Sequence, residues 1–341
     1  MPRPSLNPVS INGRPLSRVG LGAWALGGVG WGREDDCDSI AAIHHAVELG
    51  VKWIDTAAVY GGGHSERVVG EALASLAEAE RPLVFTKAGL HIDPDTGATY
   101  RDLSQESMRA ECDESLKRLR VQRIDLYQLH WPVNDPETVE LAWDTLGELR
   151  NAGKIRCAGV SNFSPELLER CAARGSIDML QTPLSLLDRR TAEDVLPWAQ
   201  THQVPTIVYS PLESGLLSGR FSLERLSNLS GDDWRPRRPQ FQTPLVERAL
   251  ELVELLRPIA DEIRASLVEL VVAWPLQNPA VASAIVGGRS PSQVDGWIGA
   301  GDLSLDDELL DRIEAALVTT RAGLGSASRR SPTGPVANRG R

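Results

Sequence analysis

The chain has 341 residues, of which 42% are hydrophobic and 24% are charged, a composition typical of a soluble enzyme. Its net charge of −10 argues against a general nucleic-acid binder, which normally presents a basic face. Because the start MPRPSLNPVS is too polar for a signal peptide and no apolar run approaches the ~20 residues that span a bilayer, we expect a cytoplasmic protein without membrane association.

An N-terminal hairpin followed by alternating strands and helices is predicted. Asn12-Gly13, between short alternating apolar flanks, is a two-residue hairpin signal. Ser164-Pro165 fits a helix N-cap followed by proline, and Gly50 and Gly153 fit positions just past helix ends. Strands are expected near residues 18–22, 52–55, 83–87, 124–129, 155–160, 178–181, 205–210 and 283–286. Helices are expected near residues 37–49, 65–79, 105–119, 137–151, 165–174, 191–202, 245–265 and 305–318.

This alternation favours an α/β fold, a closed parallel (β/α)8 (TIM) barrel that forms a single domain over residues 1–320. A doubly wound sheet is the rival, but no GxGxxG turn opens the first βα unit. Residues 215–244 form a long polar loop after the seventh strand, and loops of this length are usually functional lids or disordered. Residues 321–341, rich in Arg, Ser, Gly and Pro, are expected to be a disordered tail.

Neither disulfides nor a metal site is expected. The four cysteines, at positions 37, 112, 157 and 171, are far apart and have no metal-ligand spacing. They fall in predicted helices and one strand, which favours buried or half-buried free thiols. The histidines form no HExxH or clustered pattern, so we predict no metal.

Four side chains at or just past successive strand ends form the candidate site. Asp55, Lys87 and His130 end the second, third and fourth predicted strands, and Tyr60 follows in the loop after Asp55. Residues at the carboxyl ends of neighbouring barrel strands can converge on one spot. Only four of the 36 basic residues are lysines, so a lysine that ends an apolar strand suggests a need for a compact ammonium.

These groups suit proton transfer to a carbonyl oxygen. A tyrosine has a pKa near ~10, and we expect the ammonium of Lys87 to lower the pKa of Tyr60. Asp55 would supply the counter-charge that a buried lysine needs, and His130 would hydrogen-bond the developing alkoxide. Each residue also has an ordinary alternative role: a helix cap or loop anchor, a core-edge aromatic, a structural ion pair or a contact with a backbone carbonyl.

Seven motifs carry a resemblance to a known family. DTAAVYGGGHSE, FTKAG, LYQLHWP, GVSNF, LQTPLSLL, YSPLESGLLSG and IVGGRSPSQ follow one another along the chain. Through them, over residues 9–318, the chain resembles the aldo-keto reductases, specifically the bacterial type with a long loop after strand seven. The resemblance implies a (β/α)8 barrel that binds NADP(H), with NAD(H) as the alternative, without a Rossmann fingerprint. It also implies a catalytic tetrad of Asp55, Tyr60, Lys87 and His130, with Tyr60 as general acid.

The resemblance further implies a row of cofactor contacts. Ser161, Asn162 and Gln181 would hydrogen-bond the nicotinamide carboxamide, although Ser161-Asn162 could instead cap the next helix. Tyr209 would stack on the nicotinamide, or else pack in the barrel. The pyrophosphate would be lined, largely through backbone N–H groups, by Ser210, Leu212, Ser214, Gly215 and Leu216. The adenosine end would contact Gly287, Arg289, Ser290 and Gln293, and Arg289 beside a 2′-phosphate favours NADPH. Trp297 would stack on the adenine.

The leading hypothesis is therefore an NADPH-dependent oxidoreductase that reduces aldehyde, ketone or open-chain sugar carbonyls. Its partner would be a small-molecule carbonyl substrate, in a monomer or homo-oligomer. Trp24, Trp31 and Trp131 are expected either to line an apolar substrate pocket or simply to pack in their loops. A non-catalytic NADP(H)-binding regulatory subunit is one alternative. A Schiff-base lyase or aldolase with Lys87 as nucleophile is another.

Overall fold

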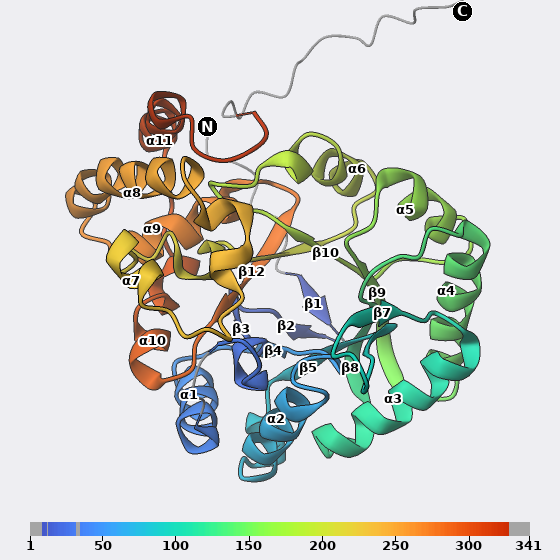
Figure 1. The fold of residues 1–341 in the computed structure, drawn as a ribbon. Helices are drawn as coiled ribbons and strands as arrows, with labels where there is room; N and C mark the ends of the chain where they lie inside the picture. The colour runs from blue at the N-terminus through green and yellow to red at the C-terminus, as the bar shows by residue number, and fades with distance from the viewer. Residues whose placement is uncertain (1–8, 12, 32–34, 327–341) are drawn as a thin grey trace, which may run out of the picture.

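The computed structural model describes residues 9–11, 13–31 and 35–326, and its centre is a closed barrel of eight parallel strands ringed by helices (Figure 1). Hydrogen bonding joins the strands in the order β10-β11-β12-β3-β4-β5-β8-β9, and β9 pairs with β10 to close the barrel. The strands are β3 (Val19–Gly22), β4 (Trp53–Asp55), β5 (Leu83–Ala88), β8 (Ile124–Leu129), β9 (Ile155–Ser161), β10 (Met179–Pro183), β11 (Thr206–Tyr209) and β12 (Val281–Gly287). All eight lie where the sequence predicts strands, so the predicted (β/α)8 fold is confirmed.

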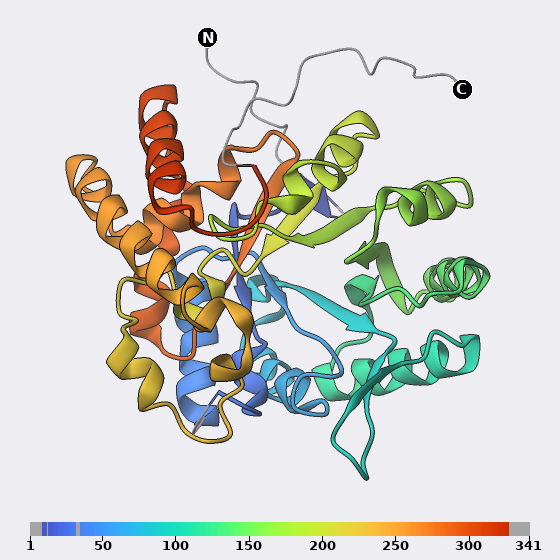
Figure 2. The same ribbon diagram turned by 45° about the horizontal axis from the view of Figure 1, so that its top comes forward.

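Helices follow the barrel strands and cover the outside of the barrel (Figures 1 and 2). The α-helices are α1 (Asp36–Glu48), α2 (His64–Ala74), α3 (Gln105–Leu119), α4 (Pro136–Asn151), α5 (Pro165–Ala172), α6 (Val195–Thr201), α7 (Leu223–Ser227), α8 (Leu245–Glu262), α9 (Leu267–Ala273), α10 (Pro291–Asp295) and α11 (Asp307–Thr320). Short 3-10 helices span Ala25–Gly27, Glu78–Glu80, Arg190–Ala192, Glu213–Gly215, Arg235–Arg237, Pro239–Phe241, Pro275–Gln277 and Ile298–Gly301. The predicted helices near 65–79 and 191–202 are each an α-helix plus one of these short turns.

Local capping chemistry explains several helix ends. Gly50 and Gly153 have φ of +94° and +77° and follow the C-cap residues of α1 and α4, as predicted. Ser164 occupies the N-cap of α5 before Pro165, although its side chain makes no capping hydrogen bond. α9 was not predicted, but it opens with a reciprocal capping box between Ser266 and Glu269, a signal that is present in the sequence.

Side-chain alternation along the strands divides the protein into an inner and an outer core. Trp53, Leu83, Phe85, Leu126, Met179, Ile207 and Ile285 point inward and form the floor of the barrel together with Ile11. Trp53 stacks on Phe85 at 5.0 Å, and it fits because Gly20 has no Cβ, which would lie 2.2 Å from the indole. These apolar side chains fill one end of the barrel. The inward-facing polar residues that come later along the strands therefore face the open, carboxyl end.

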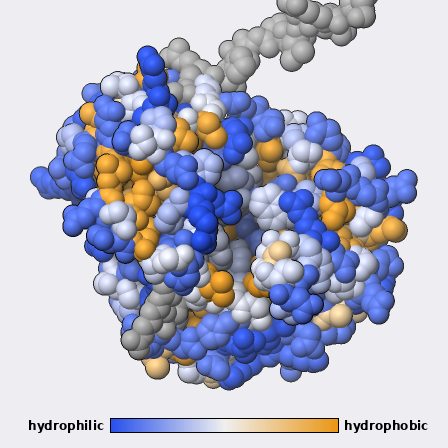
Figure 3. Space-filling view, in the orientation of Figure 1, coloured by the Kyte–Doolittle hydropathy of each residue, from blue (hydrophilic) through white to orange (hydrophobic). Residues whose placement is uncertain are grey.

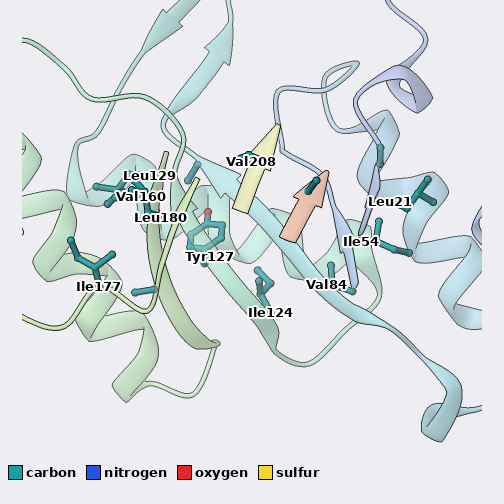
Figure 4. Close-up of a cluster of buried hydrophobic side chains, with 14 of the residues drawn as sticks. Leu21, Ile54, Val84, Ile124, Tyr127, Leu129, Val160, Ile177, Leu180 and Val208 are labelled. Atoms are coloured by element: carbon teal, nitrogen blue, oxygen red, sulfur yellow. The ribbon is translucent and has the colours of Figure 1, made fainter. Parts of the chain in front are cut away.

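The other strand residues point outward to the helices. Figure 4 shows Leu21, Ile54, Val84, Tyr127, Val160, Leu180 and Val208 on this outer side. Each of these side chains is 2% exposed or less, and they pack with apolar residues of α1 to α6. Because this outer layer is buried, the register of the strands is strongly specified. A shift by one residue would move the inward-facing polar side chains into the apolar layer between strands and helices.

Two antiparallel hairpins lie outside the barrel sheet. β1 (Ser10–Ile11) pairs with β2 (Arg14–Pro15), which fits the predicted hairpin, although Asn12 itself lies outside the described residues. β6 (Leu90–Ile92) and β7 (Thr99–Arg101) form a second hairpin, which projects from the barrel in Figure 2. The second hairpin was not predicted, because only three residues on each side pair across its Asp-Pro-Asp-Thr-Gly turn.

The loop of residues 215–244 is ordered rather than extended. It contains α7 and two 3-10 turns, and apolar side chains gather over α7 and α8 in Figure 3, where Leu223 and Leu255 are exposed. Of the predicted tail, residues 322–326 lie against the loop after β10, where the Arg189 guanidinium donates to the carbonyls of Gly325 and Ser326, each at 2.9 Å. For residues 327–341 disorder stays a prediction, because they lie outside the described residues. Within the described part of the chain, no helix is long and apolar enough to cross a membrane.

Candidate active site

The four predicted catalytic residues meet at the carboxyl end of the barrel. Lys87 Nζ donates to Asp55 Oδ2 at 2.5 Å, to the Thr56 carbonyl at 2.9 Å and to the Tyr60 hydroxyl at 3.4 Å. The rings of Tyr60 and His130 lie edge to face, with centroids 5.7 Å apart. Asp55 and Lys87 are 3% and 1% exposed, so this is a buried ion pair with a phenol and an imidazole at its open side.

The loop after β4 positions Tyr60 through a tight turn. Tyr60 N–H donates to the Ala57 carbonyl at 3.1 Å, and its own carbonyl accepts from Ser65 N–H at 3.3 Å. Gly61 has φ of +59°, and a Cβ there would lie 2.2 Å from the carbonyl oxygen of Gly27. The loop after β3 therefore presses directly on the turn that carries Tyr60, which leaves the phenol little freedom.

The second oxygen of Asp55 ties the tetrad to the opposite side of the barrel. Gln181 Nε2, in the middle of β10, donates to Asp55 Oδ1 at 2.9 Å. Asp55 thus accepts from Lys87 and Gln181 with different oxygens, and it is no helix cap. Gln128, next to Lys87 in the β5–β8 register, also faces inward, and its Oε1 lies 3.4 Å from Gln181 Nε2. The sequence analysis did not single out Gln128.

Burial controls the protonation of the site. The pKa of Tyr60 is raised well above its usual 10.0, first by desolvation and then by the negative charge of Asp55. The expected lowering of this pKa by Lys87 is therefore wrong. Desolvation lowers the pKa of Lys87 against the opposing effects of Asp55 and Glu66. It also holds the pKa of His130 well below 6.5, with Lys87 adding to the effect. At neutral pH the site presents a protonated phenol and a neutral imidazole.

The residues expected at the nicotinamide end form one hydrogen-bonded group. Asn162 Nδ2 donates to the His130 carbonyl at 2.9 Å and to Ser161 Oγ at 3.0 Å. The Tyr209 hydroxyl donates to Asn162 Oδ1 at 2.6 Å. Asn162 has φ of +65°, a left-handed conformation that asparagine tolerates better than most residues. Because Ser164 caps α5, the alternative that Ser161-Asn162 serve as the helix cap is excluded.

This group retains hydrogen-bonding capacity that suits a carboxamide. Gln181 donates through Nε2 to Asp55, which leaves Oε1 as an acceptor. Ser161 Oγ accepts from Asn162, which leaves its hydroxyl proton as a donor. One donor and one acceptor on neighbouring strands match the oxygen and the NH2 group of a nicotinamide carboxamide.

The turn after β11 is strained in the way that ligand-binding turns often are. Ser210 and Ser214 have φ of +58° and +55°. The N–H groups of Gly215 and Leu216, expected to face a pyrophosphate, donate within the turn to Leu212 and Glu213 at 3.0 and 3.1 Å. The cation beside this turn is Arg235.

Arg235 is not among the cofactor contacts assigned from the sequence, where it is only one of three arginines in a loop that could fold over cofactor or substrate. It is 8% exposed, donates to the Ser214 carbonyl at 3.3 Å, and pairs with Asp233 Oδ2 at 2.6 Å. Its guanidinium lies 5.4 Å from the centroid of the Trp31 ring. Only the folding back of the 215–244 loop brings it to residues 214 and 215, and its sequence context, DWRPRR, does not distinguish it from the arginines that follow.

The residues expected at the adenosine end lie together after β12. The Arg289 N–H donates to Gln293 Oε1 at 3.0 Å, and Arg289 Nη1 donates to the Trp31 carbonyl at 3.0 Å. Ser290 is the N-cap of the short helix α10, and a Cβ on Gly287 would meet nothing within 4 Å. Trp297 is 1% exposed, so the stacking of its ring on an adenine is not supported.

Two of the three tryptophans expected at a substrate pocket, Trp24 and Trp31, meet edge to face with ring centroids 5.0 Å apart. Trp24 lies beside the tetrad, with its ring 6.3 Å from that of Tyr60. Trp31 lies further along, between Arg235 and Arg289. Trp131 packs under the guanidinium of Arg101 from the β6–β7 hairpin, at 5.2 Å.

A fourth tryptophan, Trp234 from the 215–244 loop, completes the aromatic wall. It stacks on Trp24 at 5.3 Å and meets Trp31 edge to face at 5.4 Å. The wall of Trp24, Trp31 and Trp234 therefore joins the loop after β3 to the loop after β11. Among the described residues, no group of three or more histidine, cysteine, aspartate or glutamate side chains is arranged to hold a metal ion.

Comparisons with known proteins point to one family and one fold. The model of the aldo/keto reductase family matches residues 18–318. The aldo-keto reductase YhdN of Bacillus subtilis (strain 168) is 37% identical over 289 residues, which are 84% of this chain and 86% of that protein. The NADH-specific methylglyoxal reductase of Escherichia coli (strain K12) is 31% identical over 312 residues, 88% of this chain and 94% of that protein. The structure of a glycerol dehydrogenase from Gluconobacter oxydans is similar with a TM-score of 0.84 and 36% identity, covering 94% of this chain and 98% of that one.

Proposed function

The chain belongs to the aldo/keto reductase family, and from that premise we propose that it reduces aldehyde and ketone carbonyls, open-chain sugars included, with NADPH and a proton from Tyr60. The observation that carries the proposal is the phenol of Tyr60, held by Lys87 at 3.4 Å and backed by the buried carboxylate of Asp55. Beside a carbonyl, the phenol can donate a proton to the oxygen, and the neighbouring ammonium can stabilise the phenolate that remains. The four free thiols fit a reducing cytoplasm.

The side chains divide the work of proton transfer. Bound NADPH supplies a hydride to the carbonyl carbon. Tyr60 donates its proton to the carbonyl oxygen, and the ammonium of Lys87 stabilises the phenolate that remains. The neutral imidazole of His130 hydrogen-bonds the same oxygen and holds it toward the phenol. Asp55 keeps Lys87 charged and in place.

The proposed cofactor site follows the line from Gln181 to Gln293. Ser161, Asn162 and Gln181 would hold the carboxamide, and Tyr209 would support the nicotinamide ring. The turn of Ser210, Leu212, Ser214, Gly215 and Leu216, with Arg235 beside it, would face the pyrophosphate. Gly287, Arg289, Ser290 and Gln293 would hold the adenosine end. Arg289 beside a 2′-phosphate favours NADPH over NADH, whereas Arg235 would face the pyrophosphate that both cofactors share. A relative named for NADH specificity is 31% identical, so both cofactors belong in the test.

The contacts of Lys87 argue against Schiff-base chemistry. A nucleophilic lysine needs a free, neutral amine that can reach the substrate. The three donors of Lys87 all have acceptors, and its side chain is 0% exposed. The assembled tetrad likewise favours catalysis over a purely regulatory cofactor-binding role, which would need neither the phenol nor the ion pair.

A carbonyl panel tests the proposal. The protein is assayed with aromatic aldehydes, methylglyoxal, ketones and open-chain sugars, with NADPH and NADH in separate runs. We expect consumption of reduced nicotinamide with at least one aldehyde, and a higher kcat/KM with NADPH. Absence of turnover across the panel, together with tight NADP(H) binding, would favour the regulatory alternative instead.

The pH dependence of reduction is a second expectation. The pKa of His130 lies well below 6.5 and that of Tyr60 well above 10.0, so neither group changes its charge around neutral pH. These two groups should therefore contribute no change in rate around neutral pH. Lys87, whose pKa is lowered from 10.5, loses its proton before Tyr60 as the pH rises, so the alkaline fall in rate belongs to Lys87. A stopped-flow pH profile measures this, and an alkaline fall centred at or above pH 10.5 would contradict the assignment to Lys87.

A further inference from the structure

A second buried network lies directly behind the tetrad. Its centre is Glu66, a carboxylate on α2 that is 0% exposed. Glu66 Oε1 accepts from Thr86 Oγ1 at 2.6 Å, and Glu66 Oε2 accepts from Arg118 Nε on α3 at 2.6 Å. Thr86 is the strand neighbour of Lys87 and points to the helices, whereas Lys87 points into the barrel. The carboxylate therefore holds β5 at the residue before the catalytic lysine.

The same network reaches the loop that carries Tyr60. Arg118 packs beneath Gly63, where a Cβ would lie 2.6 Å from the Arg118 Cδ. Gly63 is the N-cap of α2, three residues after Tyr60. Since Arg118 is held by Glu66, the turn from Tyr60 to Gly63 and the strand that carries Lys87 share one anchor.

Ser65, the residue before Glu66, makes a second connection between α2 and the contacts of Lys87. Its hydroxyl donates to the Ala23 carbonyl at 2.7 Å and lies 2.8 Å from Thr56 Oγ1. The backbone carbonyl of that same Thr56 accepts from Lys87 Nζ at 2.9 Å. The first turn of α2 thus holds Thr56 through Ser65, and Thr86 through Glu66, on either side of the lysine.

We propose that Glu66 is a positioning residue for the proton transfer: through Thr86 and Arg118 it sets the distance between the Lys87 ammonium and the Tyr60 hydroxyl. The inference rests on the proposed carbonyl reduction, in which these two groups act together. A displacement of about 1 Å between reacting groups can cost about 10²-fold in rate, so an anchor shared by both groups affects kcat rather than binding.

The charge of Glu66 adds a pH signature. Lys87 faces Asp55 on β4, Tyr60, His130 and Glu66, and the two carboxylates favour its ammonium form. The charged and titratable groups around Glu66 itself are Lys87, Arg118, Glu111, Cys112 and Tyr127. Removing the negative charge of Glu66 lowers the pKa of Lys87 further. The alkaline fall in the reduction rate then moves to lower pH, because the ammonium is lost earlier as the pH rises.

The test compares Glu66→Gln with Asp125→Asn. Asp125 also braces β5, since its Oδ2 accepts from Val84 N–H at 2.9 Å and its Oδ1 pairs with Arg156 at 3.1 Å, but it does so three residues before Lys87. Both changes replace a carboxylate by an amide of the same shape. Both variants therefore lose the charge of a carboxylate that braces β5, but Asp125 braces it further along the strand from Lys87 and is slightly more exposed than Glu66.

For Glu66→Gln we expect kcat to fall about 10- to 100-fold, with the carbonyl KM and the NADPH Kd within about twofold of wild type. The alkaline limb should also move to lower pH. Asp125→Asn should leave kcat and the alkaline limb unchanged, even where its melting temperature falls. Arg118→Lys, which keeps a cation against Glu66, should retain more of kcat than Arg118→Met.

The outcomes separate the two ideas. If wild type turns over carbonyls but Glu66→Gln matches Asp125→Asn in kcat and pH profile, the positioning role is overturned and the proposed function stands. If wild type reduces no carbonyl, the proposed function fails and the inference falls with it. Should Glu66→Gln fail to fold, Thr86→Val removes the hydroxyl that donates to Glu66. A wild-type kcat and pH profile in Thr86→Val would then overturn the inference.

Discussion

Replacing Tyr60 by phenylalanine is expected to lower kcat for carbonyl reduction by about 10²- to 10⁴-fold, the usual contribution of a general acid. The change removes the hydroxyl that Lys87 contacts at 3.4 Å, while the ring that packs near Trp24 and His130 stays. The proposed cofactor contacts do not involve this hydroxyl, so NADPH binding should persist. Loss of reduced-nicotinamide absorbance with an aromatic aldehyde measures turnover, and fluorescence titration measures binding.

Tyr127 offers a matched control for this change. It is another buried tyrosine, but it points to the helices, and its hydroxyl has no hydrogen-bond partner among the described residues. Tyr127→Phe should therefore leave turnover unchanged and stability equal or improved, because it removes an unsatisfied polar atom. Unchanged turnover in Tyr60→Phe would refute the assignment of the proton donor.

Replacing Lys87 by methionine is expected to damage both stability and catalysis. Asp55 is 3% exposed and would be left as a buried carboxylate whose remaining side-chain donor is Gln181. Breaking a buried ion pair in this way lowers the free energy of unfolding by about 3–5 kcal/mol. Turnover should fall as well, because the phenolate of Tyr60 would form without a neighbouring cation. Urea unfolding at pH 7 measures the stability, and the NADPH assay measures turnover.

The double variant Lys87→Met, Asp55→Asn separates the two effects. It removes the stranded charge, so the free energy of unfolding should recover most of the loss seen in the single variant. Turnover should not recover, because no cation faces Tyr60. A single variant as stable as wild type would contradict the view that Asp55 depends on Lys87. A double variant no more stable than the single would contradict it equally.

The barrel and the tetrad were predictable because both depend on local patterns. Each predicted strand is a short apolar run, and Asp55, Lys87 and His130 stand where three of these runs stop. Parallel strands that alternate with helices close into a barrel whose carboxyl ends point the same way, so residues far apart in the chain converge. The motifs around these ends also identified the family, which the match over residues 18–318 confirms.

Long-range contacts explain what was missed. Arg235 reaches Ser214 only because the 215–244 loop folds back, and Trp31 lies beside Arg289 because Arg289 Nη1 donates to its carbonyl at 3.0 Å. The β6–β7 hairpin is held by contacts such as that of Arg101 with the Pro132 carbonyl at 2.6 Å, between segments 31 residues apart. No local pattern encodes which distant group a loop arginine will meet.

The order of residues along this chain determines where the strands end, because periodicity and chain direction are properties of the sequence. The strand ends in turn place the acid, phenol, amine and imidazole of the candidate site. Tertiary packing alone decided the protonation of those groups. The pKa of Tyr60 rises, where a pairwise argument from Lys87 predicted that it would fall. Desolvation is the cause, since it sums over every atom that excludes water from the phenol, and those atoms come from segments throughout the chain.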